Sequence, residues 1–321
     1  MELRRLGTTD LLVSPVALGC WPIAGMTSIN VNDIDSIATI RACLDVGINF
    51  LDTAFNYGPD GESERLIAQA IGGRRDEVVI ATKGGLHWGA QKDRQHDARP
   101  ETLWRECDES LRRLGTDHVD LLYLHAPDPQ TPITESAGAL AGLLAAGKTR
   151  SVGVSNVSLA QLQQFASVCP VTACQPKYNM LQREIEADIL PWCQAHEVSL
   201  VTYWPLMKGL LAGKLPRDHQ FDPTDGRAKY PMFQGTEWQR NQDLVEALRE
   251  IGHEAGKTVA QVVVNWTIHR PGITAALCGA KRPEQLRENA GALDWQLSAT
   301  QLAAIDQALL DRGPAASQNA V

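Results

Sequence analysis

The sequence predicts a (β/α)8 barrel, the TIM-barrel class of α/β fold, with an N-terminal hairpin and extra C-terminal helices. Short apolar runs of strand length alternate along the chain with segments whose apolar residues recur at helical spacing. This alternation is typical of parallel strands joined by crossover helices. Eight runs of this kind occur, at residues 16–18, 49–52, 78–82, 119–124, 151–154, 172–175, 199–203 and 273–276.

The segment 100–114 illustrates the helical pattern that separates the strands. Pro100 suits the first turn of a helix, and apolar residues recur at helical spacing from Leu103 to Leu114. Gly115 then supplies a stop signal. Eight strand and helix units of this kind are enough to close a barrel.

Four further segments depart from the repeat. Residues 3–13 contain a Gly-Thr-Thr-Asp turn and predict a hairpin that plugs the bottom of the barrel. Residues 216–235 are rich in Asp, Pro and Gly and follow the seventh strand, so we expect a lid or substrate loop on the catalytic face. Residues 298–310 predict a closing helix, and the small polar residues 313–321 predict a frayed tail. Barrels often exceed 250 residues as one domain, so we expect a single domain over residues 1–321.

The composition narrows the kinds of partner. The net charge is -8 and no Lys/Arg-rich run occurs, which argues against a nucleic-acid or anionic-membrane partner and favours a small molecule. The seven cysteines are scattered without a CxxC pair, so neither a disulfide framework nor a zinc site is predicted. No signal peptide and no membrane-spanning run is present, and we therefore expect a cytoplasmic protein in a reducing compartment.

Proton-handling residues end three successive strands. Asp52 ends the second predicted strand, with Tyr57 five residues further on, while Lys83 follows the third strand and His125 follows the fourth. The carboxyl ends of parallel strands in a barrel open onto one face, where such barrels build their active sites. We therefore expect these four side chains to converge, which predicts an enzyme.

The four residues complement one another chemically. A tyrosine has an ordinary pKa of about 10, and an ammonium about 4 Å away favours its phenolate by roughly 4 kcal/mol at an effective dielectric of 20. We therefore expect Lys83 to lower the pKa of Tyr57 by about 3, with Asp52 holding Lys83 charged and in place. A neutral His125 can donate a hydrogen bond to a substrate carbonyl and orient it toward Tyr57.

Such a set is suited to protonating a developing alkoxide. None of its side chains can deliver a hydride, so the chemistry implies a nicotinamide cofactor. Taken singly, each residue has a structural interpretation: a capping Asp, a solvated Lys or a His in the core. Four complementary residues on three successive strand ends favour the catalytic interpretation.

Several motifs extend this pattern along the chain in a specific order and spacing: LGCW at 18–21, NFLDTAFNYG at 49–58, ATK at 81–83, LYLH at 122–125, GVSN at 153–156, QPKYN at 175–179 and YWPL at 203–206. In these motifs the chain resembles the aldo-keto reductase superfamily over nearly its whole length. The resemblance implies a catalytic tetrad of Asp52, Tyr57, Lys83 and His125, in which Tyr57 is the general acid.

The resemblance also implies a nicotinamide site. It places Ser155, Asn156 and Gln175 against the carboxamide and stacks Tyr203 on the ring. Residues 206–210 match the segment that wraps the pyrophosphate in relatives, and residues 279–289 match the adenosine end. The other residues assigned in this way to the cofactor are Gly19, Cys20, Trp21, Asp52, Trp204, Pro205, Leu206, Lys208, Gly209, Leu210, Gly279, Lys281, Arg282, Gln285, Glu288 and Asn289.

The region around Lys281 favours NADP(H) over NAD(H). Lys281 and Arg282 precede a helix start at Pro283, and two cations beside exposed N–H groups of a helix N-terminus suit an extra phosphate. A solvated basic loop is the alternative interpretation. We predict no metal, because the eight histidines are isolated from one another.

The substrate is expected to be a carbonyl compound that contacts Tyr57 and His125. Trp21 and Trp88 are candidates for an apolar substrate wall, although loop packing would also explain them. Ala126 follows the tetrad histidine where many relatives have Trp, which would widen the substrate pocket.

The sequence therefore predicts an NADP(H)-dependent oxidoreductase that reduces an aldehyde or ketone to an alcohol. A short-chain dehydrogenase is excluded, because the chain has no GxGxxG and no Tyr four residues before a Lys. The alternative that stays open is a nucleotide-binding redox-sensor subunit resembling the potassium-channel β-subunits. The substrate, the direction of the reaction and the oligomeric state are not predicted.

Overall fold

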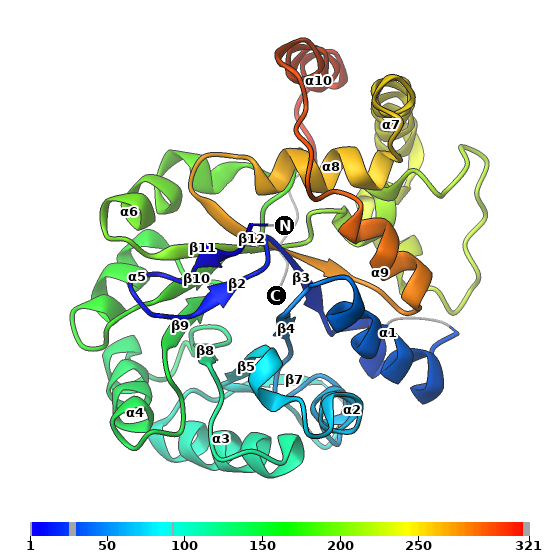
Figure 1. Cartoon of the computed structure of the whole chain (residues 1–321). Coiled ribbons are helices and arrows are strands. Elements are labelled where there is room, and N and C mark those ends of the chain that lie inside the picture. Colours follow the sequence, from blue (N-terminus) through cyan, green and yellow to red (C-terminus); the bar gives the residue numbers. More distant parts are fainter. Residues whose placement is uncertain (1, 26–29, 92, 317–321) are drawn as a thin grey trace.

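A computed structural model describes residues 2–25, 30–91 and 93–316. It contains a closed barrel of eight parallel strands surrounded by helices, which confirms the predicted fold (Figure 1). The strands follow one another around the barrel in chain order, and the last pairs with the first. They are β3 (Val16–Gly19), β4 (Phe50–Asp52), β5 (Val79–Gly84), β8 (Leu121–Leu124), β9 (Val152–Ser155), β10 (Ala173–Gln175), β11 (Ser199–Tyr203) and β12 (Ile273–Gly279).

Helices form a ring around these strands (Figure 1). The ring contains α1 (Asp33–Asp45), α2 (Glu62–Ile71), α3 (Pro100–Leu114), α4 (Ile133–Ala145), α5 (Leu159–Ala166), α6 (Ile189–Ala195), α8 (Val259–Ile268) and α9 (Pro283–Ala290). Two further helices, α7 (Gly235–Ala255) and α10 (Ala299–Arg312), pack on each other outside it. None of the helices in the described residues is long and apolar enough to cross a membrane.

Helix α3 shows how local sequence fixes these elements. Pro100 occupies the first turn, and the buried face includes Leu103, Cys107 and Leu114. The helix ends at Gly115, which adopts the left-handed conformation with φ 66°. Glycine tolerates this conformation without steric cost, so the predicted stop signal lies where the helix ends.

A hairpin of β1 (Arg4–Arg5) and β2 (Leu12–Val13) closes the bottom of the barrel (Figure 1). Its Leu6 and Leu11 are buried with residues of the barrel interior such as Phe50. The Arg4 guanidinium donates to three backbone carbonyls, those of residues 268, 273 and 274, at 2.7–3.1 Å. The predicted plug is therefore present and is tied to β12.

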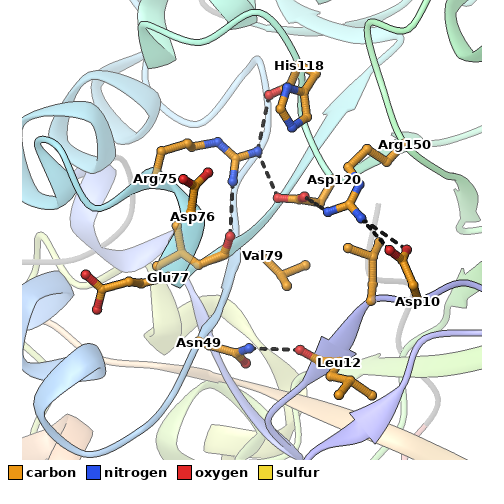
Figure 2. Close-up of a pocket in the computed structure, with 12 residues that line it drawn as sticks. Asp10, Leu12, Asn49, Arg75, Asp76, Glu77, Val79, His118, Asp120 and Arg150 are labelled. Atoms are coloured by element: carbon orange, nitrogen blue, oxygen red, sulfur yellow. Dashed lines mark hydrogen bonds and ion pairs between the residues drawn. The ribbon is translucent and has the colours of Figure 1, made fainter.

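A cavity of about 310 Å³ lies at the same end, where the strands begin (Figure 2). Asp120 accepts from Arg75 at 2.8 Å and from Arg150 at 3.1 Å, and Arg150 also pairs with Asp10 of the hairpin at 3.0 Å. Asp120 further accepts the backbone N–H of Ile80 at 2.9 Å. Arg150 thus links Asp10 of the hairpin to Asp120, the residue before β8.

Three parts of the chain add to what the sequence predicts. A second antiparallel hairpin, β6 (Leu86–Trp88) and β7 (Arg94–His96), follows β5 and was not predicted. The expected loop at 216–235 contains two 3-10 turns, η5 (Gly226–Lys229) and η6 (Pro231–Phe233). In the expected tail, Ala316 donates a backbone hydrogen bond to Glu237 of α7, while residues 317–321 lie outside the described part of the chain.

Candidate active site

The four tetrad residues lie together at the C-terminal end of the barrel strands. Asp52 is the last residue of β4, Lys83 lies near the end of β5, and His125 directly follows β8. Tyr57 lies in the turn after β4, where its N–H donates to the carbonyl of Ala54 at 3.0 Å. The strand ends thus converge as the sequence predicts.

Lys83 is the centre of the arrangement. Its Nζ lies 2.5 Å from Asp52 Oδ1, 2.8 Å from the carbonyl of Thr53 and 3.3 Å from the Tyr57 hydroxyl. Lys83 and Asp52 are both 1% exposed, so their charges face each other rather than water. The other Asp52 oxygen accepts from Gln175 Nε2 at 2.7 Å, which satisfies the carboxylate on both sides.

Lys83 is held charged by its partners. Burial alone would lower the pKa of its ammonium, but the Asp52 carboxylate and the Tyr57 hydroxyl raise that pKa above its ordinary value. Burial is also the main influence on Asp52, whose pKa it raises against the opposing effect of Lys83. The short contact between the two groups favours the ion pair, as predicted.

Tyr57 departs from the sequence-based expectation. Burial raises the pKa of its hydroxyl above the ordinary value, and Lys83 offsets only part of that effect. The predicted lowering of the Tyr57 pKa is therefore wrong for this structure, because the expectation counted the ammonium but not the loss of solvent around the phenol. Tyr57 is a neutral hydroxyl that can donate its proton.

His125 is buried and neutral. Burial, reinforced by the cations Lys83 and Arg94, lowers the pKa of its imidazole well below the ordinary value. Its Nδ1 is buried and has no hydrogen-bond partner among the described residues. The ring lies 6.0 Å from the ring of Tyr57, centroid to centroid. This position next to the tyrosine agrees with the expected role in orienting a substrate oxygen.

The predicted carboxamide-binding residues form one hydrogen-bonded cluster at the ends of β9, β10 and β11. Asn156 Nδ2 donates to the carbonyl of His125 at 2.9 Å and to Ser155 Oγ at 3.1 Å. Ser155 Oγ donates to the carbonyl of Gln175, and the Tyr203 hydroxyl donates to Asn156 Oδ1, both at 2.8 Å. The cluster contacts the tetrad twice, through the His125 carbonyl and through the Asp52 carboxylate.

Backbone strain marks the segment after β11. Trp204, Met207 and Lys208 all have positive φ, at 62°, 46° and 56°, and Asn156 has φ 58°. Residues other than glycine pay an energetic penalty there, and such residues cluster at functional sites. Asn tolerates this region better than Trp, Met or Lys, so the strain after β11 has no signal in the sequence.

Lys208 lies in this strained segment, within the short helix η4 (Met207–Ala212). Its Nζ is 4.1 Å from the ring centroid of Trp204 and 4.6 Å from that of Tyr230 in the segment 216–235. Burial, together with the nearby cations Arg94 and Lys229, lowers the pKa of Lys208 to about 8. A bound anion would favour the charged form of Lys208 and so oppose this lowering of its pKa.

The predicted adenosine end surrounds the start of α9. Gly19 pairs with Gly279 in the barrel, and Asn289 Nδ2 donates to the carbonyl of Gly279 at 3.5 Å. The backbone N–H of Lys281 donates to Gln285 Oε1 at 2.8 Å. Two charged residues of this region form ion pairs, Arg282 with Asp35 at 3.8 Å and Glu288 with Lys214 at 2.8 Å.

The remaining predicted site residues divide between core and rim. Cys20, Ala126, Pro205 and Leu210 are buried, whereas Leu206 and Gly209 are half-buried in the segment that follows β11. Figure 1 shows this segment running between β11 and α7. None of these residues provides an ionisable group that could move a proton at neutral pH, because burial raises the pKa of the Cys20 thiol well above its ordinary value.

Trp21 lies beside Tyr57, and Trp88 is hydrogen-bonded to Asn56, the residue before Tyr57. The Trp21 ring meets the Tyr57 ring edge to face at a centroid distance of 5.1 Å. Trp88 Nε1 donates to the carbonyl of Asn56 at 2.8 Å. Sequence reasoning missed one neighbour of this pair, Arg94, whose guanidinium carbon is 5.0 Å from the Trp21 ring centroid and 5.6 Å from that of Trp88.

The described residues contain no group of three or more His, Cys, Asp or Glu that could hold a metal ion. A buried lysine and aspartate beside a neutral tyrosine, at the mouth of a (β/α)8 barrel, form a site that can transfer a proton. The family model for the aldo/keto reductase family matches residues 15–310. The chain therefore belongs to the aldo/keto reductase family, whose members are oxidoreductases.

Individual relatives agree with this assignment. The chain is 37% identical to the aldo-keto reductase YhdN of Bacillus subtilis (strain 168), over 93% of this chain and 90% of that protein. It is 33% identical to the NADH-specific methylglyoxal reductase of Escherichia coli (strain K12), over 93% of this chain and 95% of that protein. The structure of the glycerol dehydrogenase AKR11B4 from Gluconobacter oxydans matches with a TM-score of 0.91 and 34% identity, covering 100% of this chain and 98% of that one.

Proposed function

We propose that this protein reduces an aldehyde or ketone to an alcohol with NADP(H), and that Tyr57 is the general acid. The observation that carries the proposal is the buried Lys83, which contacts both the Asp52 carboxylate and the Tyr57 hydroxyl at the barrel mouth. This arrangement connects a fixed positive charge to a neutral proton donor, which is what protonation of a carbonyl oxygen requires.

Each tetrad residue has a distinct task in this proposal. Tyr57 donates its proton to the substrate oxygen as negative charge develops there, and Lys83 stabilises the phenolate that remains. Asp52 keeps Lys83 charged and in position through the 2.5 Å contact. His125, being neutral, donates its ring N–H to the same substrate oxygen and so orients the carbonyl.

The residues at the ends of β9, β10 and β11 fit a nicotinamide. Ser155, Asn156 and Gln175 provide hydroxyl and amide groups in one cluster, which matches the paired donors and acceptors of a carboxamide. Tyr203 offers an aromatic ring next to them. The cofactor, when bound, supplies the hydride that these side chains cannot, and Tyr203 would cover one face of its ring.

The test of the general acid is Tyr57→Phe. This change removes the proton but little of the cofactor contact, so we expect carbonyl reduction to be abolished while NADPH binding stays nearly unchanged. Turnover is followed by NADPH oxidation with a panel of aromatic, aliphatic and sugar aldehydes, and binding by intrinsic fluorescence. Near-normal turnover of the variant would show that another group is the acid. Tight NADPH binding by the wild type without turnover of any carbonyl would favour the redox-sensor alternative.

The preference for NADP(H) is proposed from the cations near α9. Lys281 and Arg282 precede the helix, and burial, together with the neighbouring cations Arg227 and Arg282, lowers the pKa of Lys281. An extra phosphate at the helix N-terminus would relieve this repulsion. One relative is named as NADH-specific, so the preference has to be measured on this chain.

We expect the double variant Lys281→Met/Arg282→Met to weaken NADPH binding by about tenfold or more, because charge-assisted hydrogen bonds to the extra phosphate are lost. NADH, which lacks that phosphate, should bind almost as well as before. Arg287→Met, which removes an exposed charge from the other end of the same helix, is the matched control. An equal loss for both cofactors would contradict the proposed phosphate site.

A further inference from the structure

We propose that Arg94 binds an anionic group on the substrate, so that aldehydes carrying a carboxylate or a phosphate are the preferred substrate class. This inference rests on the proposed function of the same site and specifies what that site selects. Arg94 is the first residue of β7, in the hairpin that follows the strand bearing Lys83.

The position of Arg94 follows from its aromatic neighbours. Its guanidinium carbon lies 5.0 Å from the ring centroid of Trp21 and 5.6 Å from that of Trp88. Trp21 in turn contacts the Tyr57 ring, and Trp88 is tied to Asn56, the residue before Tyr57, by a 2.8 Å hydrogen bond. The cation therefore lies over two indoles, one in contact with the Tyr57 ring and the other bonded to the backbone directly before Tyr57.

The guanidinium is available for a ligand. Among the described residues, Arg94 makes no ion pair and donates no side-chain hydrogen bond. The neighbouring carboxylate, Asp93, instead accepts from Gln95 Nε2 at 3.3 Å. A cation–π contact at an exposed position holds a guanidinium only weakly and leaves its N–H groups for a further acceptor. Carboxylate and phosphate oxygens are the acceptors that match the planar fork of an arginine.

The positive charge of Arg94 influences ionisable groups at the reaction centre. It helps to depress the pKa of His125 and that of Lys208, so its field reaches both the catalytic imidazole and the strained segment after β11. These two residues lie on different strand ends, and Arg94 adds positive potential between them. A substrate whose carbonyl meets Tyr57 and His125 therefore has a cation near its far end.

The test compares matched pairs of aldehydes that differ in charge. One pair is 4-carboxybenzaldehyde and its methyl ester, and the other is glyceraldehyde 3-phosphate and glyceraldehyde. For Arg94→Met we expect kcat/KM to fall by about tenfold to a hundredfold for the charged member of a pair, mainly through KM. The neutral member should change by less than about twofold, since it makes no charge-assisted bond.

Two further variants separate charge from geometry. Arg94→Lys keeps the charge but not the fork, and should retain part of the preference. Arg112→Met removes an exposed charge from α3 and should leave both pairs unchanged. The carboxylate and phosphate pairs also show which anion fits better. Equal losses on charged and neutral substrates, or a weaker NADPH affinity in Arg94→Met, would overturn the inference, because Arg94 would then act on folding or on the cofactor.

A second readout does not need turnover. Benzoate and benzamide are titrated into the protein with bound cofactor, and quenching of tryptophan fluorescence reports binding beside Trp21 and Trp88. We expect benzoate to bind more tightly than benzamide in the wild type and the two to bind alike in Arg94→Met. Identical behaviour of the two ligands in the wild type would refute the anion site. A wild type that reduces no aldehyde would contradict the proposed function, while this titration would still test Arg94.

Discussion

His125 has a role in the proposed reaction, and its burial also makes the stability of the fold depend on pH. An imidazole has an ordinary pKa of about 6.5, and in this fold burial and two neighbouring cations depress that pKa well below it. The ring therefore stays neutral in the folded protein while the unfolded chain takes up a proton. The depressed pKa contributes stability above about pH 6.5, and this contribution is lost as the pH falls toward the folded pKa.

The pH dependence of stability can isolate this effect. Below about pH 6.5 the wild type should lose about 1.4 kcal/mol of folding free energy per pH unit from His125. His125→Gln removes the titration, so its stability should fall less steeply between about pH 7 and about pH 5. Urea unfolding at several pH values measures the two slopes, with His253→Gln on α7 as the control. Parallel slopes in wild type and His125→Gln would show that His125 is not the group responsible.

At the residue scale, the sequence predicts which side chains lie together but not how burial shifts their pKa values. Asp52, Lys83 and His125 could be placed because each ends a strand and parallel strands open onto one face. The pKa of Tyr57 could not be predicted, because it depends on how completely the folded chain removes water from the hydroxyl. Arg94 was missed because an exposed arginine in a polar segment has no sequence signal until Trp21 and Trp88 are placed beside it.

At the scale of the elements, strands β8 and β9 fit together through a glycine. A Cβ added to Gly153 would lie 2.5 Å from ring carbons of Tyr123 and 2.7 Å from the carbonyl of Ala173. Tyr123 is fully buried within the barrel interior and Ala173 belongs to the next strand, so neither can retreat cheaply. The Tyr123 ring on β8 therefore leaves room only for a glycine at position 153 of β9.

Gly153→Ala should therefore destabilise the protein by about 1–3 kcal/mol, as expected for overpacking in a tight core. Gly138 on α4 is exposed, and a Cβ added there would meet no atom within 4 Å. Gly138→Ala should instead stabilise the helix by about 0.5–1 kcal/mol. Thermal and chemical unfolding of the two variants compares the same substitution in opposite surroundings. Equal stability of Gly153→Ala and the wild type would mean that β8 and β9 can move apart.

The elements that the sequence failed to predict share a physical reason. All eight barrel strands appear because their residues are buried, and burial leaves a clear apolar run. The β7 strand of the second hairpin is exposed and polar, and β6 contains a single buried residue, Leu86, so neither strand forms an apolar run. The turns η5 and η6 are likewise local structures in a polar segment, for which hydrophobic periodicity gives no guide.

At the scale of the whole molecule, the two ends of the barrel contrast in how their polar groups are satisfied. At the bottom, apolar side chains of the hairpin and mutually paired charges around Asp120 close the barrel (Figure 2). At the top, several residues after β11 have positive φ, and Arg94 has no ion-pair partner among the described residues. This division agrees with barrels in general, where one face serves stability and the other chemistry.

The anchoring of Arg4 also bears on the order in which the chain can fold. Its carbonyl acceptors belong to residues 268, 273 and 274, which lie 264 to 270 positions later in the sequence, and β3 completes the barrel only against β12. During synthesis the first strands emerge long before these partners exist. Contacts between such distant segments form slowly because the intervening chain must be closed into a loop first. The N-terminal hairpin therefore cannot make these contacts until the last strand has been synthesised. In a ribosome-bound chain that ends before residue 268, the barrel is still open between β3 and the missing β12.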